Sequence, residues 1–214
     1  KKNNINFFYE DLHLVIYFIF VTAVFFLFFS FNYDFSNNLL AITSSMSNIG
    51  FSLKSDQPNL NFIYLILVII GGSFFSTSSG IRFLKIYALI KFSINELLSH
   101  TRPKHIYINK IAFSDKLIEQ SDLYKYFLSI IVFILSLFLV SSLLTISGIN
   151  FENSFKLAIL TLMNTVNSSM YNLGSIDFFG MNFFSKSTLI LFMIIGRVEL
   201  LTILIICKKF LFKN

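Results

Sequence analysis

Charged residues are scarce in this chain of 214 residues: Asp, Glu, Lys and Arg make up 13% of it, and apolar residues make up 55%. Soluble domains carry about 25% charged residues, so the composition excludes an ordinary soluble protein. The count of 29 Phe and a mean hydropathy of +0.73 point the same way. The sequence therefore predicts an integral membrane protein.

Cysteine and histidine are almost absent. The single Cys207 excludes a disulfide or a thiolate metal site within one chain. His13 lies at the start of an apolar run, and His100 and His105 lie in a basic loop, where contact with solvent or lipid headgroups is a better expectation than metal binding. No GxSxG, HExxH or P-loop pattern is present. We therefore expect neither an enzyme nor a bound cofactor.

Four apolar runs are long enough to cross a bilayer, which takes roughly 20 mainly apolar residues. They are Leu12 to Phe31, Leu60 to Ile81, Tyr126 to Ile146 and Ser187 to Cys207. Two shorter segments, Phe35 to Ser47 and Phe151 to Thr165, have the length of re-entrant helices. The alternative is that they lie flat on the membrane, which needs a strongly basic polar face; theirs hold Ser, Thr and Asn, with Lys156 as the one positive residue.

The two short segments resemble each other. A shift of 117 positions aligns Ala41 with Ala158, Met46 with Met163, Ile49 with Val166 and Gly50 with Asn167, and one residue of slack aligns Phe35 with Phe151. The repeat predicts two copies of a unit: a helix, a re-entrant pore helix with a filter turn, and a second helix. Non-helical backbone at membrane depth is tolerated where it is buried or lines a water-filled cavity, so we expect both turns to face a pore.

Lys and Arg concentrate in the loop from Arg82 to Lys125 and at both termini, all of which the positive-inside rule places in the cytoplasm. This topology explains the net charge of +6, and no basic face for nucleic acid is evident. Three parts are expected. They are a repeat at 1–99 (spans at about 12–31 and 60–98, pore helix 35–47), a cytoplasmic basic loop at 100–125, and a repeat at 126–214 (spans at about 126–146 and 187–210, pore helix 151–165).

Two stretches are unusual for membrane helices. The segment from Gly71 to Gly80 is rich in Gly, Ser and Thr, which weaken a helix interior, so it predicts a break that lines a cavity; close packing against a neighbouring helix is the alternative. Arg197 and Glu199 lie deep in the last apolar run, where a charge costs about 2.5 to 3.5 kcal/mol. We expect them on an ion path, or Arg197 as a buried tie to carbonyls at the end of a re-entrant helix.

These stretches resemble the signatures of the Trk/Ktr/HKT potassium transporters. GGSFFSTSSGIRFLK (71–85) resembles GGxxGSTGGGIK, and IIGRVELLTILI (194–205) resembles the LLGRLE signature of the final helix. SNIGF (47–51) looks like the TTGF filter turn, and NTVNSSM (164–170) takes the place of the NVGPGL turn. The resemblance covers nearly the whole chain and is most like the C-terminal half of a bacterial TrkH-type protein, with its third and fourth pore repeats.

The resemblance implies potassium uptake through a pseudo-fourfold pore, in which backbone carbonyls of each repeat replace the hydration shell of the ion. The implied filter residues are Ser47, Asn48, Ile49, Gly50 and Phe51 in one repeat and Thr165, Val166, Asn167 and Ser168 in the other. The implied gating loop holds Gly71, Gly72, Ser73, Ser76, Thr77, Ser78, Ser79 and Gly80. Arg197 and Glu199 match the charged residues of the family's final helix.

The resemblance also implies partners. Two repeats supply two of four filter walls, so a chain or segment carrying the first two pore repeats is needed. Complete units are expected to form a homodimer in the inner membrane of a bacterium, surrounded by lipid, with a cytoplasmic nucleotide-binding regulatory subunit on the loop around Arg102 to Lys116. Asn167 replaces a family Gly. The alternative function is a non-conducting remnant or accessory membrane subunit that keeps the fold without transport.

Overall fold

The computed structural model describes residues 9–29, 35–51, 61–71, 81, 83–101, 120–165, 171, 173, 176–197 and 209, and these form helices and connecting turns without a strand. The helices are α1 (Tyr9–Phe29), α2 (Phe35–Met46), α3 (Asn61–Ile70), α4 (Phe83–Thr101), α5 (Gln120–Ile146), α6 (Phe151–Met163) and α7 (Phe183–Arg197). The all-α class predicted from the sequence is confirmed for this part of the chain.

Helix length separates α5 from the two short helices. At about 1.5 Å per residue, the 27 residues of α5 extend about 40 Å, whereas the 12 of α2 and 13 of α6 extend about 18 and 20 Å. The hydrocarbon core is about 30 Å thick. Within the described residues, α5 is the helix that is both long and apolar enough to cross it, and the apolar stretch Val15–Val24 of α1 is shorter. The four crossings stay a prediction.

The longest helix, α5, is apolar on two faces. Its buried residues Phe133, Leu137, Val140 and Leu144 follow helical spacing and form the stripe that packs inward. Large apolar side chains such as Leu135 are exposed on the other side. A helix that is apolar all round is either buried in a large core or in contact with lipid, and the exposed side chains of α5 agree with lipid contact.

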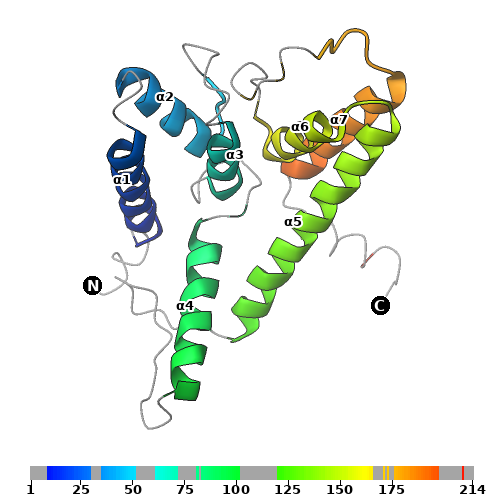
Figure 1. Ribbon diagram of the computed structural model, residues 1–214. Helices are drawn as coiled ribbons and strands as arrows, with labels where there is room; N and C mark the ends of the chain where they lie inside the picture. Colours follow the sequence, from blue (N-terminus) through cyan, green and yellow to red (C-terminus); the bar gives the residue numbers. More distant parts are fainter. Residues whose placement is uncertain are drawn as a thin grey trace, which may run out of the picture.

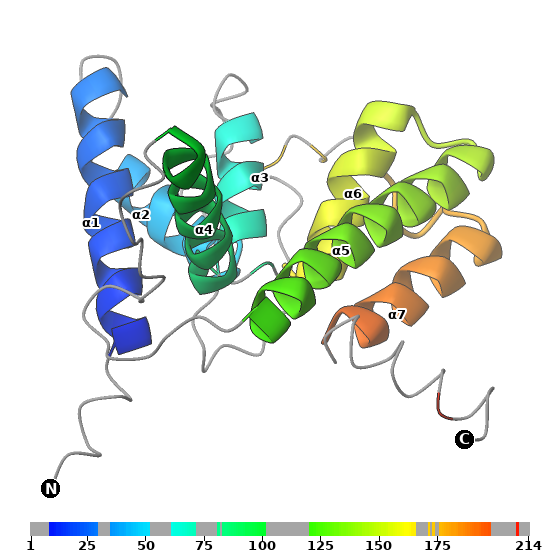
Figure 2. The ribbon, with the colours of Figure 1, turned by 90° about the horizontal axis from the view of Figure 1, so that it is seen from below.

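Each of the two short helices packs against more than one neighbouring helix. α6 contacts α5, α7 and α3, and α2 contacts α1 and α3. Both views separate α5, α6 and α7 from α1 to α4 (Figures 1 and 2), and the contacts of α3 with α6 and of α4 with α5 join the two groups. All residues from Leu157 to Met163 are buried, so the second half of α6 is surrounded by protein.

The expected break in the second span agrees with the end of α3. This helix ends at Ile70, and Gly71 is already outside it. The chain is helical again from Phe83, the first residue of α4, so two helices occupy the range predicted as the span 60–98. Lys85 of α4 donates a hydrogen bond to Ser129 of α5, with 3.3 Å between Nζ and Oγ, which ties the two groups together.

Candidate ion pathway

The turn after α2 is held by one serine. The backbone carbonyl of Ser44 accepts the N–H groups of Ile49 (3.1 Å) and Gly50 (3.5 Å), and its buried hydroxyl accepts the N–H of Phe51. The N–H groups of Ser47 and Asn48 also donate to α2, at Thr43 and Ser45. Every amide from 47 to 51 is therefore directed back to the helix.

Asn48 closes α2 in the left-handed conformation, with φ at 57°. Its N–H bonds the carbonyl of Ser45, and the next N–H, of Ile49, bonds that of Ser44. This pair of bonds is the Schellman motif, which satisfies carbonyls at the end of a helix. Asn tolerates the left-handed region better than most residues, so the sequence supports the turn without glycine at this position.

The second short helix ends in the same motif. Asn164, with φ at 55°, follows α6. Its N–H bonds the carbonyl of Thr161 at 3.2 Å, and the N–H of Thr165 bonds that of Leu160 at 3.0 Å. By this motif, Asn164 is equivalent to Asn48 and Thr165 is equivalent to Ile49, with 116 positions between the members of each pair (48 and 164, 49 and 165).

The shift of 117 is therefore wrong for these turns, and the pairing of Ile49 with Val166 is wrong with it. A shift of 116 also pairs the two buried hydroxyls that bond back into their own helices, Ser45 to Ala41 and Thr161 to Leu157. The register of the repeat is set by backbone hydrogen bonds, whereas the sequence alignment relied on side-chain identity.

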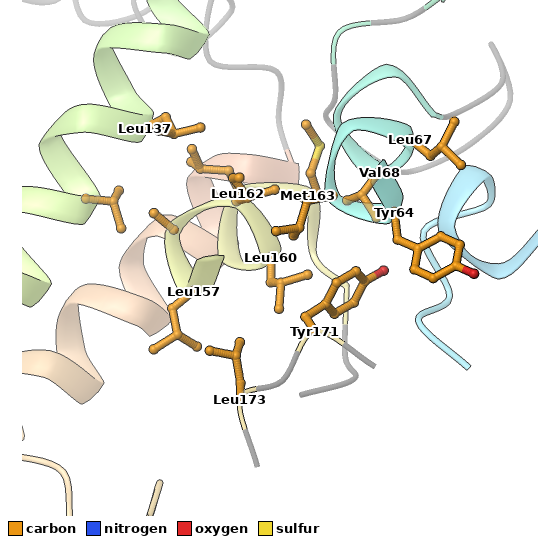
Figure 3. Packing of buried hydrophobic residues seen from close by; sticks show 14 of the residues in the cluster. Tyr64, Leu67, Val68, Leu137, Leu157, Leu160, Leu162, Met163, Tyr171 and Leu173 are labelled. Atoms are coloured by element: carbon orange, nitrogen blue, oxygen red, sulfur yellow. The ribbon is translucent and has the colours of Figure 1, made fainter. Parts of the chain in front are cut away.

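The two turns differ in what supports them. At a shift of 116, Leu160 occupies the place of Ser44, so the equivalent position of α6 has no hydroxyl. Tyr171 is fully buried and packs in the cluster that joins α6 to α3 (Figure 3). Its hydroxyl interacts with Ser45 of α2, without the geometry of a full hydrogen bond. The segment after the second turn thus contacts the first repeat.

The predicted filter residues alternate between buried and exposed. Asn48 and Gly50 are buried, and Ser47, Ile49 and Phe51 are exposed. In the second turn, Thr165 is buried, and its hydroxyl has no hydrogen-bond partner among the described residues. Val166, Asn167 and Ser168 lie outside the described residues.

Among the residues predicted for the gating loop and for the pore charges, the structure describes Gly71 and Arg197. Gly71 contacts the carbonyl of Met46, at the end of α2. Arg197 is the last residue of α7 and is exposed, and its role on an ion path or as a tie to carbonyls stays a prediction. Glu199 and the remaining members of the predicted loop lie outside the described residues, namely Gly72, Ser73, Ser76, Thr77, Ser78, Ser79 and Gly80.

An ion pair lies at the start of α6. Lys156 Nζ is 2.6 Å from Glu152 Oε1, and the Glu152 side chain is 78% exposed. The hydrogen bond from Lys156, with its positive charge, holds the pKa of Glu152 below its usual range. No cluster of His, Cys, Asp and Glu able to hold a metal occurs in the part of the chain that the structure describes.

Ser44 and Tyr171 are the functional candidates that sequence reasoning missed. Serines near a helix end often bond to nearby backbone, which was the available signal for Ser44. Three serines, Ser44, Ser45 and Ser47, share that region, and the sequence does not distinguish which one holds the turn. Tyr171 carried no local signal, because its partners lie in another part of the chain.

The exposed apolar side chains of α5, a helix long enough to cross a bilayer, are typical of an integral membrane protein. The profile of the TrkH family, described as "Cation transport protein", matches residues 32–211. The chain belongs to this family, and the resemblance stated from its motifs is confirmed. No curated protein sequence matches the chain significantly.

The fold is similar to the crystal structure of the potassium transporter TrkH from Vibrio parahaemolyticus. The TM-score is 0.73 and the sequence identity 21%, over 90% of this chain and 42% of that transporter. The chain therefore spans less than half the length of the solved protein.

Proposed function

We propose that this chain is the C-terminal half of a Trk-type potassium uptake system in the inner membrane of a bacterium. The observation that supports this best is the first turn, in which every amide from 47 to 51 is directed to α2. Backbone carbonyls coordinate potassium in a selectivity filter, and amides fixed on the helix leave the carbonyls as the groups for an ion. The substrate is potassium, and no cofactor takes part.

The filter consists of residues 47–51 and 165–168, in the third and fourth repeats of a four-repeat pore. The common Schellman motif after α2 and α6 supports equivalent roles for the two turns. The segment 71–80 forms the gating loop beneath them. Arg197, exposed at the end of α7, and Glu199 are the charges of the path.

The other two filter walls come from a chain or segment with the first two repeats. The match to 42% of the Vibrio parahaemolyticus transporter supports this division. Complete units form a homodimer, and a nucleotide-binding subunit binds the basic loop at 100–125. Both termini and this loop are cytoplasmic, since they hold most of the Lys and Arg.

Growth of a potassium-uptake-deficient bacterium at low potassium tests the proposal. The chain is expressed with and without the adjoining upstream reading frame, and its abundance in the membrane is measured in both strains. Rescue that requires the upstream frame supports the proposal. No rescue in either strain, with the protein present in the membrane, would refute it and favour the non-conducting remnant.

A further inference from the structure

Gly71 and Gly196 make the same contact in the two repeats. A Cβ on Gly71 would lie 2.5 Å from the carbonyl oxygen of Met46, at the end of α2. A Cβ on Gly196 would lie 2.5 Å from the carbonyl oxygen of Leu162, near the end of α6. Met46 and Leu162 are equivalent at the shift of 116 that the turns define (46 and 162).

Space, rather than backbone conformation, requires glycine at both places. Neither residue is among the described glycines with positive φ, so a left-handed backbone is not the reason for glycine, although a Cβ on Gly71 would also lie 2.8 Å from the carbonyl oxygen of Leu67 in α3. Alanine is even the better helix former at Gly196, inside α7. The obstacle is a backbone carbonyl, which cannot rotate away as a side chain can.

The contacted carbonyls lie next to the filter turns. The carbonyl of Met46 belongs to the peptide bond that begins the first turn, and the N–H of that peptide bond, from Ser47, donates to Thr43. Displacing this oxygen therefore rotates the peptide plane at the start of the turn. The carbonyl of Leu162 lies two residues before the left-handed Asn164.

We propose that Gly71 and Gly196 are positioning residues for the filter. Each lets the second helix of its repeat, α3 or α7, approach the end of the pore helix closely, as small residues do between membrane helices. The contact fixes the height of the filter turn. Gly71 then belongs to the support of the filter and not to the moving part of the gating loop. This inference rests on the proposed potassium transport by this chain.

The test compares Gly71→Ala and Gly196→Ala with Gly180→Ala. A Cβ on Gly180 would meet the Asp177 carboxylate at 2.8 Å, but that group is the end of an exposed side chain, which can shift as a backbone carbonyl cannot, so Gly180→Ala is the matched control. Amide hydrogen exchange of the purified chain is measured at 48–49 and 164–165. Potassium uptake is measured in cells that also express the upstream frame.

We expect amide hydrogen exchange to be about tenfold faster at 48–49 in Gly71→Ala and at 164–165 in Gly196→Ala. Overpacking a tight contact destabilises the local structure by enough to give a change of this size. The control leaves both pairs of amides unchanged. The KM for potassium rises and competition by sodium increases, with Vmax per molecule little changed, because the filter is displaced while the rest of the path is intact.

Three results would overturn the inference. They are unchanged exchange and KM in both variants, an effect in one variant only, or absence of both variants from the membrane, which would make the glycines folding residues. Failure of the proposed function is seen separately, as absence of uptake by the unsubstituted chain. The exchange measurement then still decides the role of the glycines, because it needs no transport.

Discussion

Removing the Ser44 hydroxyl should loosen the turn after α2, the first turn of the proposed filter. In Ser44→Ala the N–H of Phe51 loses its acceptor, while the N–H groups of Ile49 and Gly50 keep the backbone carbonyl of residue 44. The helix α2 is not otherwise disturbed, since alanine is a good helix former. The perturbation is thus confined to the last residue of the turn.

The expected cost depends on how far water reaches the freed N–H, because Ser44 is 5% exposed whereas Phe51, which carries this N–H, is 55% exposed. Leaving a donor unsatisfied in a buried place costs about 1 to 3 kcal/mol. If the whole cost falls on the turn, its opened form becomes roughly 5 to 150 times more populated. The lower value applies if water reaches the freed N–H.

Hydrogen exchange at the amide of residue 51 measures this change directly, and sodium inhibition of potassium uptake reports its effect on the filter. Ser141→Ala is the matched control, because Ser141 is fully buried and its hydroxyl has no hydrogen-bond partner among the described residues. Removing an unsatisfied hydroxyl should leave stability unchanged or raise it slightly. We therefore expect Ser44→Ala to lower stability, and Ser141→Ala to leave it unchanged or raise it slightly.

Two results would refute the reasoning. Unchanged exchange at residue 51 in Ser44→Ala would show that the hydroxyl does not hold the turn. Equal loss of thermal stability in Ser44→Ala and Ser141→Ala would show that both serines act through core packing instead.

Three further predictions concern other residues of the pathway. Gly50→Ala should abolish growth rescue, since a side chain at φ 73° costs about 1 to 2 kcal/mol in the filter turn. Gly148→Ala, which is equally strained at φ 98° in the α5–α6 connection, should retain growth rescue. Equal phenotypes of the two variants would argue against a role of Gly50 in the filter. Arg197→Ala should change the uptake rate and Arg197→Lys should preserve most of it, measured by rubidium influx; indifference to both would favour the remnant. Because the pKa of Glu152 is lowered, its ion pair with Lys156 is ionised at neutral pH and is lost as the pH falls through that pKa. The melting-temperature difference between wild type and Glu152→Gln should therefore be constant from about pH 7 to 5 and become smaller below about pH 5.

The helices were predictable from the sequence because their signals are local. The lengths of the short segments separated α2 and α6 from the long apolar runs, and the small residues from Gly71 onward marked the end of α3. These properties depend on the apolar length and helix propensity of each segment alone.

The register of the repeat was not predictable in this way. Sequence identities such as that of Met46 with Met163 favoured a shift of 117. The structure of the turn depends instead on which helix carbonyls accept hydrogen bonds from the amides that follow the helix. The useful signal was Asn48 and Asn164, because Asn is one of the few residues that tolerates the left-handed position. Aligning these two residues first gives 116, and the contacts of Gly71 and Gly196 then become equivalent as well.

The described residues beyond the two turns make different contacts. The first turn is held by its own pore helix through Ser44. The segment after the second turn packs through Tyr171 on the cluster shared with α3 and interacts with Ser45 of α2. The backbone that follows the first turn thus bonds its own pore helix, whereas Tyr171 packs among residues of both repeats. The turns after α2 and α6 therefore share a backbone motif but differ in the contacts made by the described residues that follow them.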